Sequence, residues 1–102
     1  MTGVLGYLLI VVAGALLANG VPHLVSGVRG DRFPTPFATP PGRGVSSPVI
    51  NVLWGVANGL VGAALAIRWL PHRVAPLEDA LCAAGFLAMA LFAAHHFGKV
   101  RN

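Results

Sequence analysis

A few histidines and amides are the side chains in this sequence with types and spacing suited to chemistry. His23 follows Asn19 by four residues, and His95 and His96 are adjacent near the end of the chain. Imidazole nitrogens ligate transition metals and haem iron, so His23 with His95 or His96 could hold a metal, haem, a quinone or a lipid head group. Adjacent helical residues point about 100° apart, so only one of His95 and His96 could readily join His23.

Further polar residues extend this candidate ligand-binding set. Asn51 is expected near the same end of the molecule, and Arg29, Arg32 and Arg43 could steer an anion toward it. Polar groups within a membrane are costly and are functional candidates by default. In the structural alternative, the histidines are interfacial residues at helix ends and the amides join neighbouring helices. No cofactor is firmly implied, and a metal at His23, His95 and His96 is one option among several.

Catalytic motifs are missing from the sequence. There is no Gly-x-Ser-x-Gly, no His-Glu-x-x-His, no phosphate-binding Gly-Lys-Ser/Thr loop and no pair of acids within an apolar run. The single cysteine, Cys82, excludes an internal disulfide. The sequence therefore favours a role other than catalysis.

The composition of this chain is typical of a protein surrounded by lipid. Of its 102 residues, 56% are hydrophobic and only 10% are charged, whereas soluble domains carry about 25% charged residues. The apolar runs are long enough for a bilayer core of about 30 Å. We predict an all-α integral membrane protein, a three-transmembrane-helix bundle forming one domain over 1–102. Its helices span residues 3–27, 48–70 and 77–97, with a proline-rich loop at 28–47 between the first two.

The polar stretch 29–51 is compositionally distinct. It contains five of the eight prolines and three of the seven basic residues. Proline forces extended backbone on the residue before it, so this is not a flexible Gly/Ser linker. The segment could lie on the membrane interface or fold back against the helices; a disordered, solvated loop is the alternative.

Small residues mark the expected packing faces. Gly55, Asn58, Gly59 and Gly62 recur at three- and four-residue steps in the second expected helix, and Ala80, Ala84 and Ala88 form a stripe on the third. Such faces let membrane helices approach closely while amides bond across the interface. The two sets predict where helices pack.

Basic residues predict the orientation. The loop and the C-terminal tail share one side with five Lys and Arg residues, and the other side has Arg68 and Arg73. The positive-inside rule predicts an N-terminus outside, and the loop and C-terminus in the cytoplasm. Because the bases lie in the gaps between apolar runs, we expect no nucleic-acid partner.

Several short motifs together resemble a known group. The motifs that carry the resemblance are Asn19-Gly-Val-Pro-His23, Phe33-Pro-Thr-Pro-Phe-Ala38, Pro40-Pro-Gly42, Ser46-Ser47 and Asn51-Val-Leu-Trp-Gly55. The chain resembles a group of small, uncharacterised bacterial multi-pass membrane proteins. The resemblance covers residues 19–59 and implies a bacterial inner-membrane protein. The group has no established activity, so the resemblance adds no catalytic residue.

Three functions are consistent with these observations. The first is a structural or interaction component of the lipid bilayer, acting as an oligomer or as an accessory subunit of another membrane protein, with the loop as its contact surface. The second is a membrane-embedded protein that binds a ligand, metal, haem or quinone through His23 and His95 or His96. The third is a small transporter, which would need oligomers because three helices are too few to enclose a pore.

Overall fold

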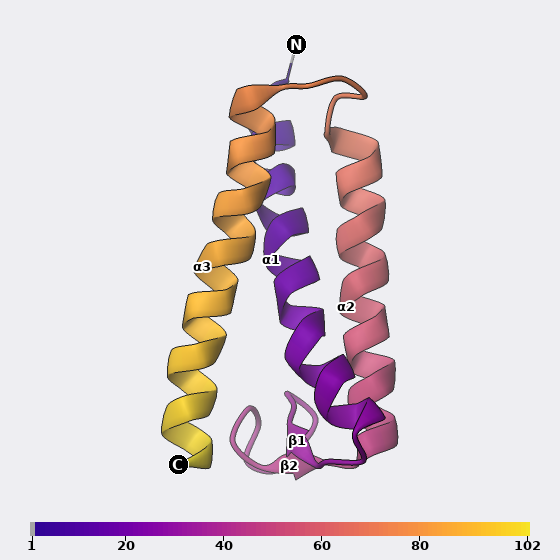
Figure 1. Ribbon diagram of the computed structural model, residues 1–102, viewed down its shortest axis with the longest axis vertical. Helices are drawn as coiled ribbons and strands as arrows, with labels where there is room; N and C mark the ends of the chain where they lie inside the picture. Colours follow the sequence, from indigo (N-terminus) through magenta and orange to yellow (C-terminus); the bar gives the residue numbers. More distant parts are fainter. Residues whose placement is uncertain (1) are drawn as a thin grey trace.

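The computed structural model describes residues 2–102, which form three long helices and one short hairpin (Figure 1). The elements are α1 (Val4–Val28), β1 (Phe33–Pro34), β2 (Val45–Ser46), α2 (Pro48–Trp69) and α3 (Pro76–Arg101). All three helices are long and apolar enough to cross a membrane, which confirms the predicted all-α, multi-pass architecture. The molecule is 43 Å long, close to the about 40–45 Å of a bilayer with its head-group regions.

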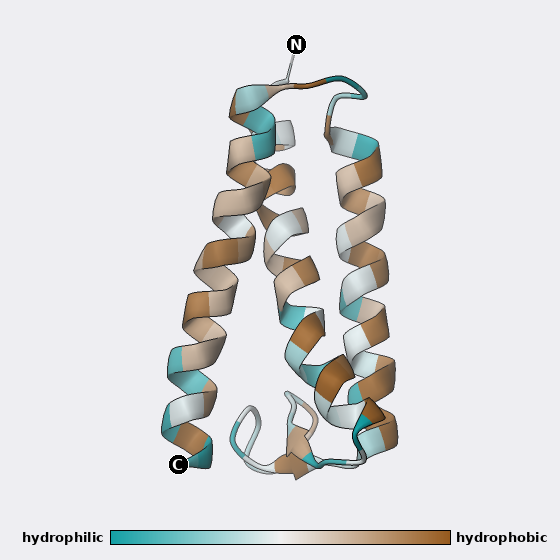
Figure 2. Cartoon of the chain, in the orientation of Figure 1, coloured by the Kyte–Doolittle hydropathy of each residue, from teal (hydrophilic) through white to brown (hydrophobic). Residues whose placement is uncertain are grey.

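The polar residues are concentrated at the two ends of the bundle (Figure 2). The hairpin and the C-terminus lie at one end, and the N-terminus and the α2–α3 connection lie at the other (Figure 1). Between these ends the helices carry apolar side chains on their outer faces, such as Leu53 and Leu60 of α2 and Leu91 of α3, which are exposed. This distribution is the one that a surrounding lipid phase requires.

The helix boundaries differ from the prediction mainly at the end of α3. The helix begins at Pro76 and continues past Phe97 to Arg101, so Gly98 does not terminate it. Asn102 closes the last turn, because its backbone and side-chain N–H groups both donate to the Gly98 carbonyl, at 3.2 and 3.1 Å. Basic residues in that turn also favour the negative end of the helix dipole.

The central element is α1, which packs against both α2 and α3. Glycine makes both contacts close. A Cβ on Gly55 of α2 would lie 2.6 Å from the Leu24 nitrogen of α1. A Cβ on Gly85 of α3 would collide with the Val11 carbonyl. The backbones of α1 and its two neighbours therefore lie too close together for a side chain at either glycine.

The packing faces agree only partly with the prediction. Gly55, Asn58 and Gly62 are buried on the α2 face toward α1, but a Cβ on Gly59 would meet no atom within 4 Å. In α3, Ala80, Ala84 and Ala88 are all exposed, and the buried residues are Gly85 and Ala93. The alanine stripe is therefore not the face that packs within the chain, because Gly85 permits a closer approach on a different face.

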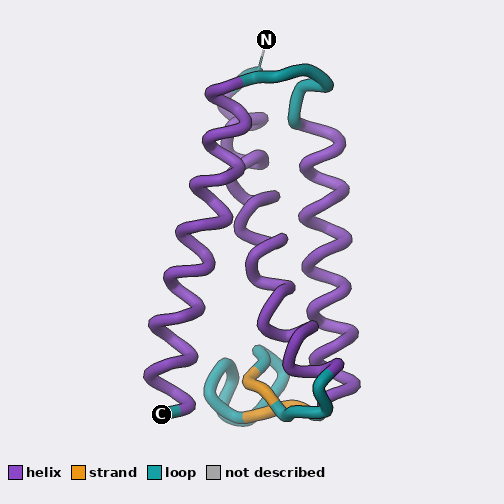
Figure 3. The backbone as a smooth tube through the Cα atoms, in the orientation of Figure 1, coloured by secondary structure: helices purple, strands orange, loops and turns teal. Residues whose placement is uncertain are grey.

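The segment between α1 and α2 is a folded hairpin (Figure 3). Its strands pair antiparallel, with Phe33 opposite Ser46. Within the turn, the Gly42 N–H donates to the Thr35 carbonyl and the Gly44 N–H donates to the Pro40 carbonyl, both at 2.8 Å. Phe33, Pro34 and Thr35 are buried, so this segment folds back against the helices.

Candidate functional site

Asn51, in the first turn of α2, connects the hairpin to the bundle. The helix begins at Pro48 because the Ser47 hydroxyl caps it by accepting from the Ile50 N–H. The Asn51 side chain is 0% exposed, and its amide nitrogen donates to the carbonyls of Phe33 (3.0 Å), Ser46 (3.2 Å) and Ser47 (3.1 Å). One side chain thus holds both strands of the hairpin against α2.

His23 of α1 bonds to the other side of the same amide. Its Nδ1 lies 2.9 Å from Asn51 Oδ1. Because the Asn51 nitrogen faces three carbonyls, its oxygen faces the imidazole, so His23 Nδ1 carries the proton and donates. In the neutral ring the lone pair is then on Nε2, which has no hydrogen-bond partner among residues 2–102. His23 is 2% exposed.

His96 of α3 belongs to the same cluster of side chains. Its Nε2 lies 2.8 Å from the Gly42 carbonyl, so this nitrogen donates to the hairpin. The Phe97 ring packs against both imidazoles, with centroids 5.9 Å from His23 and 5.1 Å from His96. His95 is exposed and is outside the cluster.

A pocket of about 220 Å³ lies where these groups meet, at the junction of hairpin and helices. His23, Asn19, Trp54 and His96 line it together with prolines and phenylalanines. Asn19 donates to Asn58 Oδ1 at 3.0 Å. The Trp54 Nε1–H is buried and has no hydrogen-bond partner within the described chain.

Trp54 is the site residue that sequence analysis missed. Tryptophan in an apolar run is typical of core or lipid-facing positions, so its type alone gave no indication of a site. The available signal was its position, three residues after Asn51 and four before Asn58, which places it among the amides of one helix. A buried indole N–H also usually finds a partner, and this one has none in the part of the chain that is described.

The three predicted arginines do not join the pocket. Arg29, Arg32 and Arg43 are exposed and are not among its lining residues. Arg29 pairs with Asp31 at 3.4 Å on the surface. Arg101, which was not predicted, lies over the Phe33 ring at 5.1 Å from its centroid and donates to the Arg32 carbonyl at 3.3 Å.

Metal or haem binding by His23 with His95 or His96 stays a prediction. Residues 2–102 contain no group of three or more His, Cys, Asp or Glu placed to hold a metal ion. His23 and His96 each use one ring nitrogen on a protein oxygen, and the Phe97 ring packs against both. These contacts fix the orientation of both imidazoles.

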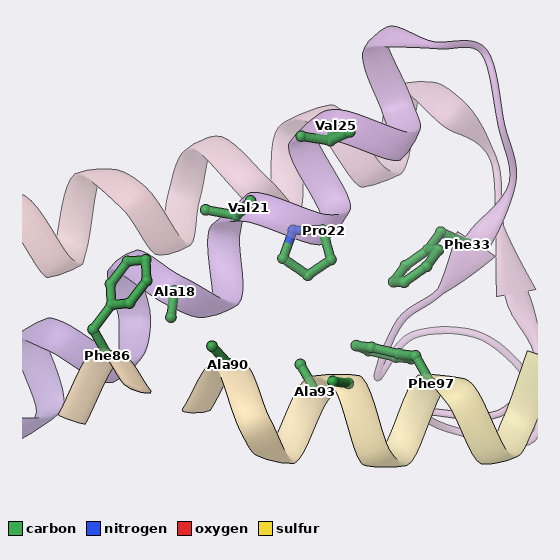
Figure 4. A pocket seen from close by; sticks show the side chains of 10 residues that line it. Ala18, Val21, Pro22, Val25, Phe33, Phe86, Ala90, Ala93 and Phe97 are labelled. Carbon is green, nitrogen blue, oxygen red and sulfur yellow. The ribbon is translucent and has the colours of Figure 1, made fainter. Parts of the chain in front are cut away.

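A second, larger pocket of about 370 Å³ lies between α1 and α3. All of its lining residues are apolar, and Phe97 lines both this pocket and the polar one. Figure 4 shows Pro22 of α1, Phe33 of β1 and Phe97 of α3 facing the same space. An apolar space of this kind suits hydrocarbon.

Comparison of the chain with protein-family models, with curated proteins and with solved structures gives no match.

Proposed function

We propose that this chain is an accessory subunit of a membrane complex, which anchors itself by three helices and presents the hairpin of residues 29–47 as a fixed contact surface. One observation carries the proposal. Hydrogen bonds from Asn51 and His96 attach the hairpin to the helices, while its arginine side chains are exposed.

The attachment involves all three helices. Asn51 of α2 holds both strands, and His23 of α1 holds Asn51. From α3, His96 donates to the Gly42 carbonyl and Arg101 donates to the Arg32 carbonyl. A loop that is already fixed loses little conformational entropy on binding, so its contacts contribute more fully to affinity.

The charge of this end favours an acidic partner segment. Arg29, Arg32, Arg43, Lys99 and Arg101 belong to it, and Asp31 is its acidic residue. By the positive-inside rule this end is cytoplasmic. Phe37, 64% exposed, adds an aromatic contact beside the cations. The surface suits an acidic cytoplasmic segment of a second membrane protein.

Site-specific photo-crosslinking in intact cells tests this proposal. The photoreactive residue is placed at Thr39 in the hairpin, with Val74 in the α2–α3 connection as the matched control; both positions are exposed. We expect one discrete adduct with another polypeptide from Thr39 and none from Val74. The adduct should disappear when Arg32 and Arg43 are replaced by glutamate.

Two results would contradict the proposal. The same adducts from both positions would mean that the hairpin has no specific partner. An adduct that survives the charge reversal, or one that contains only lipid, would show that the basic surface does not recognise an acidic protein segment.

A further inference from the structure

The pocket between the hairpin and the helices carries hydrogen-bonding groups, and none of its described lining residues is Asp, Glu, Lys or Arg. His23 Nε2 is an acceptor in the neutral ring, because Asn51 fixes the proton on Nδ1. The Trp54 Nε1–H is a donor without a partner among the described residues. Asn19 uses its amide nitrogen on Asn58, which leaves its oxygen as a second acceptor.

These groups select a neutral, hydroxyl-bearing ligand. None of the described lining residues is Asp, Glu, Lys or Arg, so an ion would lose its hydration without gaining a counter-charge. A hydroxyl group can donate to an imidazole lone pair and also accept from an indole N–H. It is therefore the functional group that matches both His23 and Trp54.

The size and walls of the pocket favour a single aromatic ring. Its volume is about 220 Å³, and an apolar protein cavity of about 150 Å³ is known to hold benzene. Phe92, Phe97 and Trp54 form part of its wall. Flat aromatic walls pack well against a flat ring, in stacked or edge-to-face geometry.

The neighbouring apolar pocket provides a place for a hydrocarbon tail. It adjoins the polar pocket at Phe97 and is lined by apolar residues of α1 and α3 (Figure 4). Val21 and Val25 on its rim are about half exposed, at 49% and 44%. In a membrane those exposed faces meet lipid, so a tail in this pocket could continue into the bilayer.

We infer that the chain binds a hydroquinone carrying a long hydrocarbon tail, with the ring between His23 and Trp54 and the tail along the α1–α3 pocket. One ring hydroxyl donates to His23 Nε2, and a ring oxygen accepts from the Trp54 N–H. The inference concerns binding alone and is independent of the partner proposed for the hairpin.

The test is a titration of the detergent-solubilised chain with a hydroquinone bearing a decyl chain, read by native mass spectrometry. We expect saturable binding of one molecule per chain. Trp54→Phe removes the N–H together with the five-membered ring of the indole, and His23→Asn keeps a donor for Asn51 while removing Nε2. Each should weaken binding by about fivefold to tenfold, the effect of one hydrogen bond.

Two controls separate specific binding from partition into the micelle. His95→Asn, at an exposed position outside the pocket, should bind like the wild type. The dimethyl ether of the same hydroquinone, which cannot donate, should bind at least about fivefold more weakly. If His23→Asn fails to fold, Trp54→Phe decides alone, because its N–H has no partner in the described protein.

The inference is overturned if the folded wild type shows no saturable binding. It is also overturned if the ether binds as well as the hydroquinone, or if Trp54→Phe binds as the wild type does. Retention of a phospholipid in place of the probe would likewise overturn it, because the polar pocket would then accept a charged head group.

Discussion

Replacing Gly55 by alanine is expected to destabilise the α1–α2 contact strongly, whereas the same change at Gly59 is not. The added Cβ at Gly55 would lie 2.6 Å from the Leu24 nitrogen and 2.9 Å from the Gly20 carbonyl oxygen. Ordinary contact begins at 3.4 Å, and both obstacles are backbone atoms that cannot rotate away. The two helices must therefore separate by about 1 Å, and overpacking of this kind costs about 1–3 kcal/mol.

Gly59 is a matched control on the same helix. Its added Cβ would meet no atom within 4 Å, so alanine there introduces no clash. Because alanine is also the better helix former by up to about 1 kcal/mol, Gly59→Ala should be neutral or slightly stabilising. The helix-propensity gain is the same at both positions, so the two variants should differ by the overpacking cost of about 1–3 kcal/mol, or about fivefold to 150-fold in the unfolding equilibrium constant.

Reversible unfolding in mixed micelles, followed by tryptophan fluorescence, measures this difference. Each variant is titrated with denaturing detergent, and its unfolding free energy is compared with that of the wild type. If Gly55→Ala and Gly59→Ala agree within about 0.5 kcal/mol, the spacing of α1 and α2 is not set by the glycine contact, and the reasoning is refuted.

Three further predictions address the hairpin, α3 and the orientation. Asn51→Leu should cost about 3 kcal/mol or more, because it leaves buried carbonyls of the hairpin and the His23 N–H without partners. Hydrogen exchange at residues 33–46 should rise sharply in this variant, and unchanged protection would show that Asn51 does not hold the hairpin. Ala84→Leu should alter the unfolding free energy by less than about 0.5 kcal/mol, because Ala84 is exposed; a larger loss in the same micelle titration would place it in a packed interface. A reporter that works only in the cytoplasm should be active when it is fused after Asn102. Activity of a reporter that works only outside the cytoplasm would show that the predicted orientation is wrong.

The three helices could be predicted because long apolar runs leave few alternatives. The exact end of α3 could not, because Gly98 resembles a stop signal until the cap formed by Asn102 is seen. For a related reason, the face of α3 that packs within the chain could not be predicted. Small residues on α3 occur on more than one face, and sequence alone does not reveal that Gly85 is the one in contact with α1.

The sequence predicted some of the residues of the candidate site, but not how they are arranged. His23 and Asn51 were identified as polar residues at one end of the bundle, and they bond directly at 2.9 Å. The fold of the hairpin was not predictable, because the proline-rich segment gains its order from hydrogen-bond donors on α2 and α3 and from rings of α1 and α3 that pack against Phe33. Trp54 was missed because an unpartnered N–H is a property of packing, and its spacing from Asn51 and Asn58 was the one signal that the sequence offered.

The two polar pairs between α1 and α2 have a consequence for how the chain enters the membrane. His23 bonds to Asn51, which follows it by 28 residues, and Asn19 bonds to Asn58, which follows it by 39. At synthesis rates of about 5–20 residues per second, the first helix waits about 1–8 seconds for these partners. During that wait it carries two unpaired polar groups, which are costly in hydrocarbon. The polar side chains of the first helix are therefore matched only once the second helix has been made, and this pairing favours the two helices settling in the bilayer as one helical hairpin.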